Sequence, residues 1–333
     1  MSEKLYRFKN PISVISAASV VGKEEKDGPL GSKFDYFCED NRFEKPSWEQ
    51  SEGEMQRIAL NTALEKCNMS SDGLDAVFAG DLINQCTGSS FGLLDFDVPY
   101  FGIYGACSTC AQGLILASVL CDSYHANRCA AVTSSHFCTA ERQFRYPLEY
   151  ASLSKPTSQH TATASGAFIL SREKGDAHIV SAMGGISTDM GITDANNMGA
   201  AMAPAAIGTL LRFFEATNTK PDDYSKIITG DLGNEGYNIV LEFMSDKGYD
   251  MQKVYTDCGL LLYDRKKQNM LAGASGCGCS ASILASHFLP MVRSGESDNI
   301  LFIGTGALLS QKSAGQGLSI PAIAHLVNIR RSL

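Results

Sequence analysis

The chain of 333 residues contains one sequence pattern twice. The segment SSDGLDAVFAGDLINQ (residues 70–85) places an acidic turn before an apolar run and then reads Gly-Asp-Leu, with an asparagine two residues later. The segment TKPDDYSKIITGDLGNE (residues 219–235) has the same features in the same order, shifted by 150 residues. Self-similarity along a chain is the signature of duplicated structural units. The pattern therefore indicates two copies of one folding unit.

Two further pairs follow in the same order. GACSTCAQGLILAS (105–118) and GASGCGCSASILAS (273–286) agree at six of fourteen positions. RCAAVTSSH (128–136) and NILFIGTGALLS (299–310) are both apolar runs that stop in small or polar residues, as strands do. Three collinear pairs indicate a gene duplication.

A helical pattern precedes each Gly-Asp-Leu segment, with apolar residues spaced at i, i+3, i+4 and i+7. These residues are Met55, Ile58, Ala59, Thr62 and Ala63 in the first copy and Ile207, Leu210, Leu211 and Phe214 in the second. We expect Ser51 and Glu54 to form a capping box that opens the first helix. Helices and strands alternate in each half, which predicts an α/β fold with a mainly parallel sheet. We assign residues 1–172 and 173–333 to the two halves and expect a ligand site between them.

Composition excludes several classes of function. With 44% apolar residues the chain can bury a large core, and no apolar run reaches the roughly 18 residues of a membrane helix. The net charge of -8 argues against binding to nucleic acid, because a phosphate backbone would be repelled. The N-terminus lacks the apolar core of a signal peptide, so we expect a cytoplasmic protein whose eleven cysteines are mostly reduced.

Several stretches of the chain resemble the stage V sporulation protein AD family of endospore-forming bacteria, within the thiolase superfamily. They are KEEKDGPLGSKFD, AGDLINQ, YGACST, VTSSH, TAERQFRYPLEY, MGITDANNMGAAMAPAA, SGCGCSA, GTGALLS and IPAIAHL, and together they span roughly residues 8–327. The resemblance implies a duplicated five-layer α-β-α-β-α thiolase-like fold and a homodimer. It also implies binding of dipicolinic acid (pyridine-2,6-dicarboxylate), with or without calcium, for uptake into the developing spore. The implied partners are membrane proteins of the same operon, at the inner membrane of the forespore and spore.

In thiolase-like enzymes the nucleophilic cysteine stands where this chain has Cys107, at the start of a buried helix whose dipole favours thiolate. Ketoacyl synthases carry a histidine at the position where this chain has Asp231, in TGDLGNEG. Without that base we expect no catalysis. The alternative is a Cys107-dependent acyltransferase with another base, for which His136 is the candidate. A third hypothesis is a scaffold that only bridges partners.

A ligand with two carboxylates on a pyridine ring requires hydrogen-bond donors spaced as the carboxylates are, and an aromatic side chain to lie against the ring. We expect the ligand-binding residues to be Cys107, Ser108, Thr109, His136, Arg142, Arg145 and Asp231, with Phe144 or Tyr146 against the ring. A competing interpretation is that Arg142 and Arg145 form structural ion pairs with Glu141 and Glu149. For His136 the competing interpretation is a core histidine whose hydrogen bonds are satisfied within the protein. Asp81 and Asp231 occupy equivalent positions, which favours a structural role for both, accepting from N–H groups of the following turn.

Metal binding is a weaker hypothesis. Cys107 and Cys110 form C-x-x-C, and Cys277 and Cys279 form C-x-C in the equivalent element. Four thiols can hold zinc or an iron-sulfur cluster, but the flanking residues are small and helical rather than loop-like. No calcium-loop spacing is present, and we predict no metal site and no cofactor.

Overall fold

The computed structural model describes residues 4–144 and 154–331. Arg145, Tyr146 and Glu149, to which the sequence assigned ligand or partner roles, lie outside the described residues. The elements of the first half are β1 (Leu5–Val21), α1 (Lys23–Lys26), β2 (Tyr36–Phe37), α2 (Trp48–Lys66), β3 (Ala76–Gly80), α3 (Thr87–Gly92), β4 (Tyr100–Gly102), α4 (Thr109–Asp122), β5 (Arg128–Ser135), α5 (Phe137–Phe144), β6 (His160–Thr161) and β7 (Ala164–Ser171).

The second half repeats this order. Its elements are β8 (His178–Met183), α7 (Met198–Thr217), β9 (Lys226–Thr229), α8 (Gly233–Asp246), β10 (Tyr255–Asp257), α9 (Cys258–Leu261), β11 (Ala274–Ser275), α10 (Cys277–Ile283), a π-helical turn (Leu284–Phe288), α11 (Leu289–Ser294), β12 (Asn299–Ala307), α12 (Gln311–Gly315) and β13 (Ala322–Arg330). The predicted division at residues 172 and 173 falls in the connection between β7 and β8 and remains a prediction.

Strand order displays the duplication. One half pairs its strands as β4-β3-β5-β7-β1 and the other as β10-β9-β12-β13-β8, so each strand has a counterpart at the same place. β3, β4 and β5 are parallel, as are β9, β10 and β12, whereas β7 and β13 run antiparallel to their neighbours. Each sheet is therefore mixed rather than mainly parallel. The long strand β1 also pairs with β8, which joins the two sheets.

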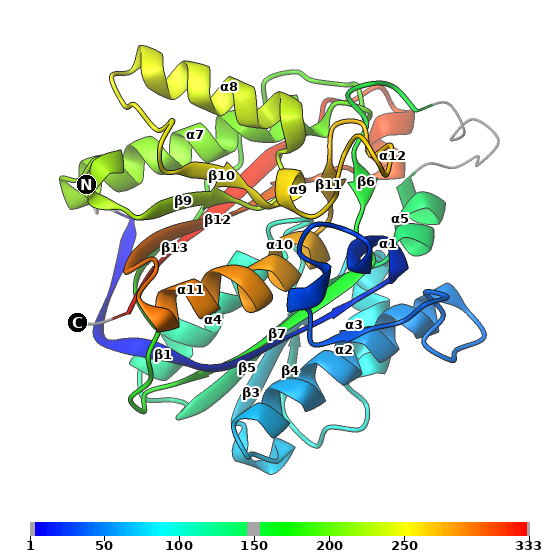
Figure 1. The fold of residues 1–333 in the computed structure, drawn as a ribbon, viewed down its shortest axis with the longest axis vertical. Coiled ribbons are helices and arrows are strands. Elements are labelled where there is room, and N and C mark those ends of the chain that lie inside the picture. The colour runs from blue at the N-terminus through cyan, green and yellow to red at the C-terminus, as the bar shows by residue number, and fades with distance from the viewer. Residues whose placement is uncertain (1–3, 145–153, 332–333) are drawn as a thin grey trace.

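Five layers are visible in Figure 1: α7 and α8, a sheet, the helices α4, α10 and α11, the second sheet, and α2 with α3. The apolar residues form three main cores that match the spaces between these layers. Leu114 and Phe288 lie in the central core, Phe213 lies in the core beneath α7, and Leu60 lies in the core beneath α2. The expected five-layer architecture is confirmed.

Small residues at the start of α10 allow the helix to lie directly on the first half. A Cβ atom added at Gly278 would overlap the carbonyl oxygen of Ala164 in β7, and one added at Gly166 would lie 2.7 Å from Ala281. The run Cys-Gly-Cys-Ser-Ala-Ser thus has a packing function, because a side chain at these points would force the layers apart.

The predicted start of α2 is wrong by one turn. Ser47 is the N-cap, and its side chain accepts from the N–H of Gln50 at 3.3 Å. Ser51 lies inside the helix, where its hydroxyl donates to the carbonyls of Arg42 and Ser47. The sequence contains two consecutive Ser-x-x-Gln/Glu patterns, at residues 47–50 and 51–54, and the helix begins at the earlier one.

Candidate functional site

Cys107 lies at a turn that leads into α4. The preceding residue, Ala106, has a left-handed backbone with φ of 49°, which turns the chain sharply before the helix. The N–H groups of Ser108 and Thr109 donate to the carbonyls of Gly105 (3.0 Å) and Ala106 (3.2 Å). Both donors are therefore already used, and the prediction that they form the floor of an anion pocket is wrong.

Asp231 from the second half meets Cys107 from the first. Its carboxylate is fully buried, and it accepts from the N–H of Gly276 at 2.8 Å and from the hydroxyls of Thr305 (2.8 Å) and Ser275 (3.3 Å). Ser275 links it to Cys107, whose sulfur lies 4.0 Å from the Ser275 hydroxyl oxygen. The sequence analysis assigned both residues to the site but predicted no proximity between them. In the structure they lie close together, between the two halves.

The electrostatics of this pair oppose a thiolate. Burial, and next the nearby charge of Asp231, raise the pKa of Cys107 well above its ordinary value. Burial also raises the pKa of Asp231 to about 6. The helix dipole at the start of α4 favours thiolate, but it is a modest effect compared with burial beside a carboxylate. The electrostatics therefore favour the neutral thiol form of Cys107.

Two small cavities lie near this pair, and Ser275, which contacts both Cys107 and Asp231, connects the pair to the smaller one. One of about 30 Å³ reaches Ser275, and another of about 120 Å³ shares two of its lining residues, Glu141 and Gln159. The first is lined by Ala140, Glu141, Phe144, Gln159, Thr161, Ala195, Asn196, Met198 and Ser275, and the second by Phe137, Glu141, Ser154, Ser158, Gln159, His160, Asn269, Met270 and Leu271. In the part of the chain that the structure describes, hydroxyl, amide and aromatic groups line both cavities, and no lysine or arginine does.

An aromatic pair borders the larger cavity. The ring of Phe137 stacks on that of His160, with centroids 4.1 Å apart and planes 9° from parallel. Phe144, one of the two ring partners predicted from the sequence, lines the smaller cavity. These cavities thus offer flat apolar surfaces beside polar groups, which is the usual composition of a small-molecule site.

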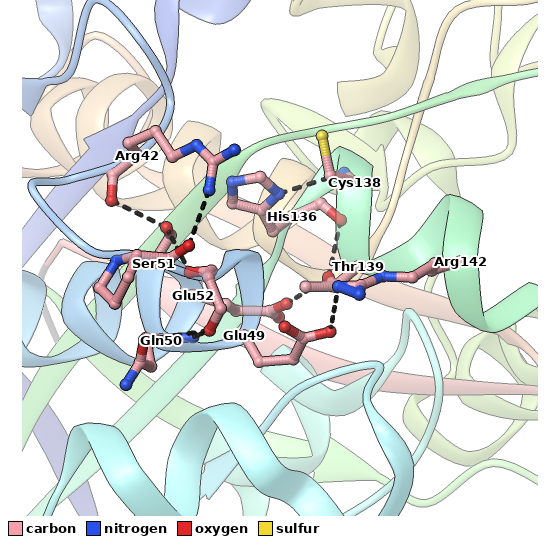
Figure 2. Close-up of polar contacts among 11 residues, drawn as sticks. Arg42, Glu49, Gln50, Ser51, Glu52, His136, Cys138, Thr139 and Arg142 are labelled. Carbon is pink, nitrogen blue, oxygen red and sulfur yellow. Dashed lines mark hydrogen bonds and ion pairs between the residues drawn. The ribbon is translucent and has the colours of Figure 1, made fainter.

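His136 is a satisfied core histidine. Its Nδ1 accepts from the N–H of Cys138 at 3.1 Å (Figure 2). Its Nε2 donates to the carbonyl of Asn41 at 3.0 Å. The side chain is 1% exposed, and burial lowers its pKa. Because both ring nitrogens are used, the predictions that His136 binds a carboxylate or serves as the base for Cys107 are wrong. The competing interpretation is confirmed.

Arg142 pairs with Glu49 rather than with Glu141. The guanidinium lies 2.8 Å from the Glu49 carboxylate, and the arginine side chain is 49% exposed (Figure 2). Arg142 is not among the residues that line the two cavities. Arg142 thus belongs to a structural ion pair, as the competing interpretation states, but its partner is Glu49.

A buried carboxyl lies next to His136 and Arg142. Glu52 accepts from the hydroxyl of Thr139 at 2.6 Å (Figure 2). It also accepts from the hydroxyl of Ser134 at 3.1 Å, and so links α2 to β5 and α5. Burial raises its pKa to about 8. No sequence pattern indicates this contact, since Glu52 lies within an ordinary run of polar helix residues.

The equivalent aspartates Asp81 and Asp231 have different environments. Asp81 accepts from the N–H groups of Ile83 (2.8 Å) and Ser89 (2.7 Å), which confirms its predicted role in the following turn. In the second half that role belongs to Asp257, which accepts from Leu232 (2.9 Å) and Gly233 (3.0 Å). Asp231 is thereby left to face the thiol. Sequence reasoning missed Asp257 because it lies on strand β10, 26 residues after Asp231, and not in the turn that it stabilises.

The four thiols of the two cysteine motifs have separate hydrogen-bonding environments. Cys277 donates to the Ser134 carbonyl at 2.9 Å, whereas Cys279 lies 3.9 Å from that of Gly230. Within residues 4–144 and 154–331, no group of three or more histidine, cysteine, aspartate or glutamate side chains is arranged to hold a metal ion.

Comparison with known proteins links the chain to one family. The model of the family described as stage V sporulation protein AD matches residues 2–330. A relative in Bacillus subtilis (strain 168), named stage V sporulation protein AD, is 42% identical over 98% of this chain and 96% of its own length.

Among solved structures, the fold is similar to those of condensing enzymes. The 3-oxoacyl-[acyl-carrier-protein] synthase III of Aquifex aeolicus matches with a TM-score of 0.58 and 14% identity, over 96% of this chain and 99% of that one. A variant of OleA from Xanthomonas campestris matches with a TM-score of 0.62 and 14% identity, over 98% and 99% of the two chains. These likenesses establish the thiolase-like fold. No helix in the described ranges has the length and apolarity to span a bilayer.

Proposed function

Because the chain belongs to the stage V sporulation protein AD family, we propose that it binds dipicolinic acid without chemically transforming it, as a step in uptake into the developing spore. The proposal places the ligand in the cavities beside Cys107 and Ser275. It assigns the protein to the cytosolic side of the spore membrane, next to membrane proteins of the same operon. The observation that carries the non-catalytic part is the burial of Cys107 next to Asp231, to which Ser275 links it through contacts of 4.0 Å and 3.3 Å.

A carboxylate at this point suits binding better than acyl transfer. Nucleophilic attack requires a thiolate and then a proton donor or oxyanion donor for the tetrahedral intermediate. Asp231 disfavours the thiolate by its charge, and as a carboxylate it repels a developing oxyanion. Its own hydrogen bonds to Gly276 and Thr305 fix it in place, so the carboxylate is held rigidly.

The cavity lining supplies the complementary groups. The hydroxyl of Thr161 and the amide of Asn196 are donors for a carboxylate, and Phe144 offers a face for a pyridine ring. Neutral donors leave part of the ligand charge uncompensated. A calcium ion carried in with the dicarboxylate would neutralise that charge, and we include the calcium chelate among the ligands to test.

The homodimer is part of the proposal. β4 is an edge strand that pairs only with β3 in the described sheet, and Phe101 on it is 51% exposed. Tyr104, which follows β4, is also exposed. An edge strand with exposed aromatic side chains is a site at which another chain can pair.

Titration calorimetry with dipicolinate, with and without calcium, tests the binding. Ala140→Leu is the diagnostic variant, because Ala140 is buried and lines the smaller cavity, which an added isobutyl group would fill. Arg142→Ala is the matched control outside the cavity, since its partner is Glu49. We expect wild type and the control to bind alike and Ala140→Leu to lose at least tenfold in affinity. No saturable binding to wild type would refute the proposal.

The same protein tests the alternative enzyme. Incubation with acyl-coenzyme A followed by intact-mass measurement would show an acyl group on Cys107 if the chain were an acyltransferase. We expect no mass increase. A stoichiometric thioester at Cys107 would favour the acyltransferase over the binding protein, and partner binding without ligand affinity would favour the scaffold.

A further inference from the structure

A second cavity lies at the other end of the N-terminal half. It has a volume of about 430 Å³ and is lined by Asn10, Tyr124, Asn127, Arg128, Ser171, Arg172 and Glu173. β5 runs from this cavity at Arg128 to the α10 start at Ser135, a distance of about 23 Å at roughly 3.3 Å per residue. α4 likewise spans about 20 Å between the turn at Cys107 and the residues before Tyr124. The two sites are therefore separate.

Arg172 is the central cation of this cavity. Its guanidinium lies over the ring of Tyr124, 4.3 Å from the centroid, and donates to the side-chain oxygen of Asn127. None of the ion pairs found within the described ranges involves Arg172. A stacked guanidinium that no carboxylate neutralises is preorganised for an oxyanion.

Unused donors surround the same space. The Nε atoms of Arg128 and Arg172 are buried and have no hydrogen-bond partner. A buried donor without a partner carries a cost that a ligand or an ordered water removes. The hydroxyl of Tyr124 accepts from the Asn10 amide at 2.8 Å, which leaves its proton available to donate.

Tyr124 is held in an unusual conformation at this cavity. It follows the end of α4 with φ of 62°, in the left-handed region that glycine or asparagine normally occupies there, and its side chain is 65% exposed. A bulky side chain in this region costs of order 1 kcal/mol. The contacts with Asn10 and Arg172 retain the ring in this position.

Three carboxylates lie close to the cavity. Asp75 accepts from the N–H groups of Asn127 (2.6 Å) and Arg128 (3.0 Å), and Asp122 accepts from that of Asn10 (3.2 Å), so both have partners. Glu173, 61% exposed, pairs with Arg128. Only this exposed pair competes directly with an incoming anion, and such pairs are weak.

We propose that this cavity binds a carboxylate or phosphate group of a small anionic metabolite, with Arg172 as the principal ligand and Arg128, Tyr124 and Asn10 around it. The ligand displaces Glu173 from Arg128 and accepts the unused guanidinium donors. This site is independent of the proposed dipicolinate site.

Calorimetric titration of the full chain with phosphate and, separately, with citrate at low ionic strength tests the proposal. We expect saturable binding of at least one anion. The anion with the higher affinity shows whether the site prefers a phosphate or a carboxylate group. Arg172→Met should weaken it at least tenfold, because it removes charge-assisted hydrogen bonds. Glu173→Gln should strengthen it severalfold by releasing Arg128.

Arg212→Met is the matched control. Arg212 lies on α7 and bonds only within its own helix, to Gly208 and Thr209, so the variant removes the same charge elsewhere and should bind as wild type does. Thermal unfolding verifies that each variant is folded. If Arg172→Met does not fold, the test is the anion affinity of Glu173→Gln. An affinity equal to that of wild type would then refute the site. Absence of saturable binding at millimolar anion, or equal binding by a folded Arg172→Met, also overturns the proposal.

Discussion

Replacing Asp231 with asparagine tests whether its charge keeps Cys107 in the thiol form. Both side chains are buried, and the chain Cys107–Ser275–Asp231, with contacts of 4.0 Å and 3.3 Å, places the thiol and the carboxylate in one small volume. At an effective dielectric constant of about 20, two like charges a few ångströms apart repel by about 3 kcal/mol. Asp231→Asn removes this repulsion and should therefore lower the pKa of Cys107.

The assay is alkylation by iodoacetamide, with Cys107 identified by peptide mass spectrometry. At pH 8 Asp231 is ionised, because its pKa is about 6. As long as the thiol pKa stays above the pH, loss of about 3 kcal/mol of repulsion raises the thiolate fraction, and therefore the rate, by about 100-fold. Burial limits access equally in both proteins, so the ratio of rates isolates the electrostatic effect.

Asp81→Asn is the matched control, because Asp81 is the equivalent residue in the other half and does not act on Cys107. It should leave the alkylation rate of Cys107 unchanged. Equal rates in wild type and a folded Asp231→Asn between pH 7 and 9 would refute the electrostatic reasoning.

Three further predictions concern stability. Gly278→Ala should destabilise the fold by about 1–3 kcal/mol, measured by chemical denaturation, because the added methyl overlaps the Ala164 carbonyl; unchanged stability would contradict the packing function given to the run. Ser47→Ala should cost about 1 kcal/mol in the same assay by removing the α2 cap, whereas no loss would indicate that the helix begins elsewhere. The pKa of Glu52 is raised to about 8, so its contribution to stability is full below its unfolded value near 4.5 and is lost as the pH rises through 8. Glu52→Gln should flatten that part of the pH–stability curve, and a curve that keeps the wild-type slope would refute the assignment.

Local patterns were sufficient to predict the architecture. The repeated Gly-Asp-Leu strands, the helical spacing around Leu210 and the small residues before α10 each depend on nearby sequence, and the corresponding elements form as expected. The capping box was misplaced because the sequence offers two starting points, Ser47 and Ser51, that differ only in which turn packs against the core.

The site was predictable only in part. The sequence analysis assigned both Cys107 and Asp231 to the site. Whether an aspartate accepts hydrogen bonds from the N–H groups of its own turn depends, however, on whether a carboxylate from another element already does so. Asp257 fills the turn in the second half, and no local pattern shows this. His136 likewise has a partner, Asn41, that lies 95 residues away in the chain. Long-range pairing of polar groups is decided by tertiary packing, which short patterns do not encode.

The most direct test of the account is a crystal structure of the protein grown with saturating dipicolinate. The account predicts density for the ligand across the two adjoining cavities, with the pyridine ring beside Phe144 and a carboxylate near Thr161 and Asn196. Density only in the distant cavity around Arg172, or a thioester on Cys107 after exposure to acyl-coenzyme A in the same crystals, would contradict it.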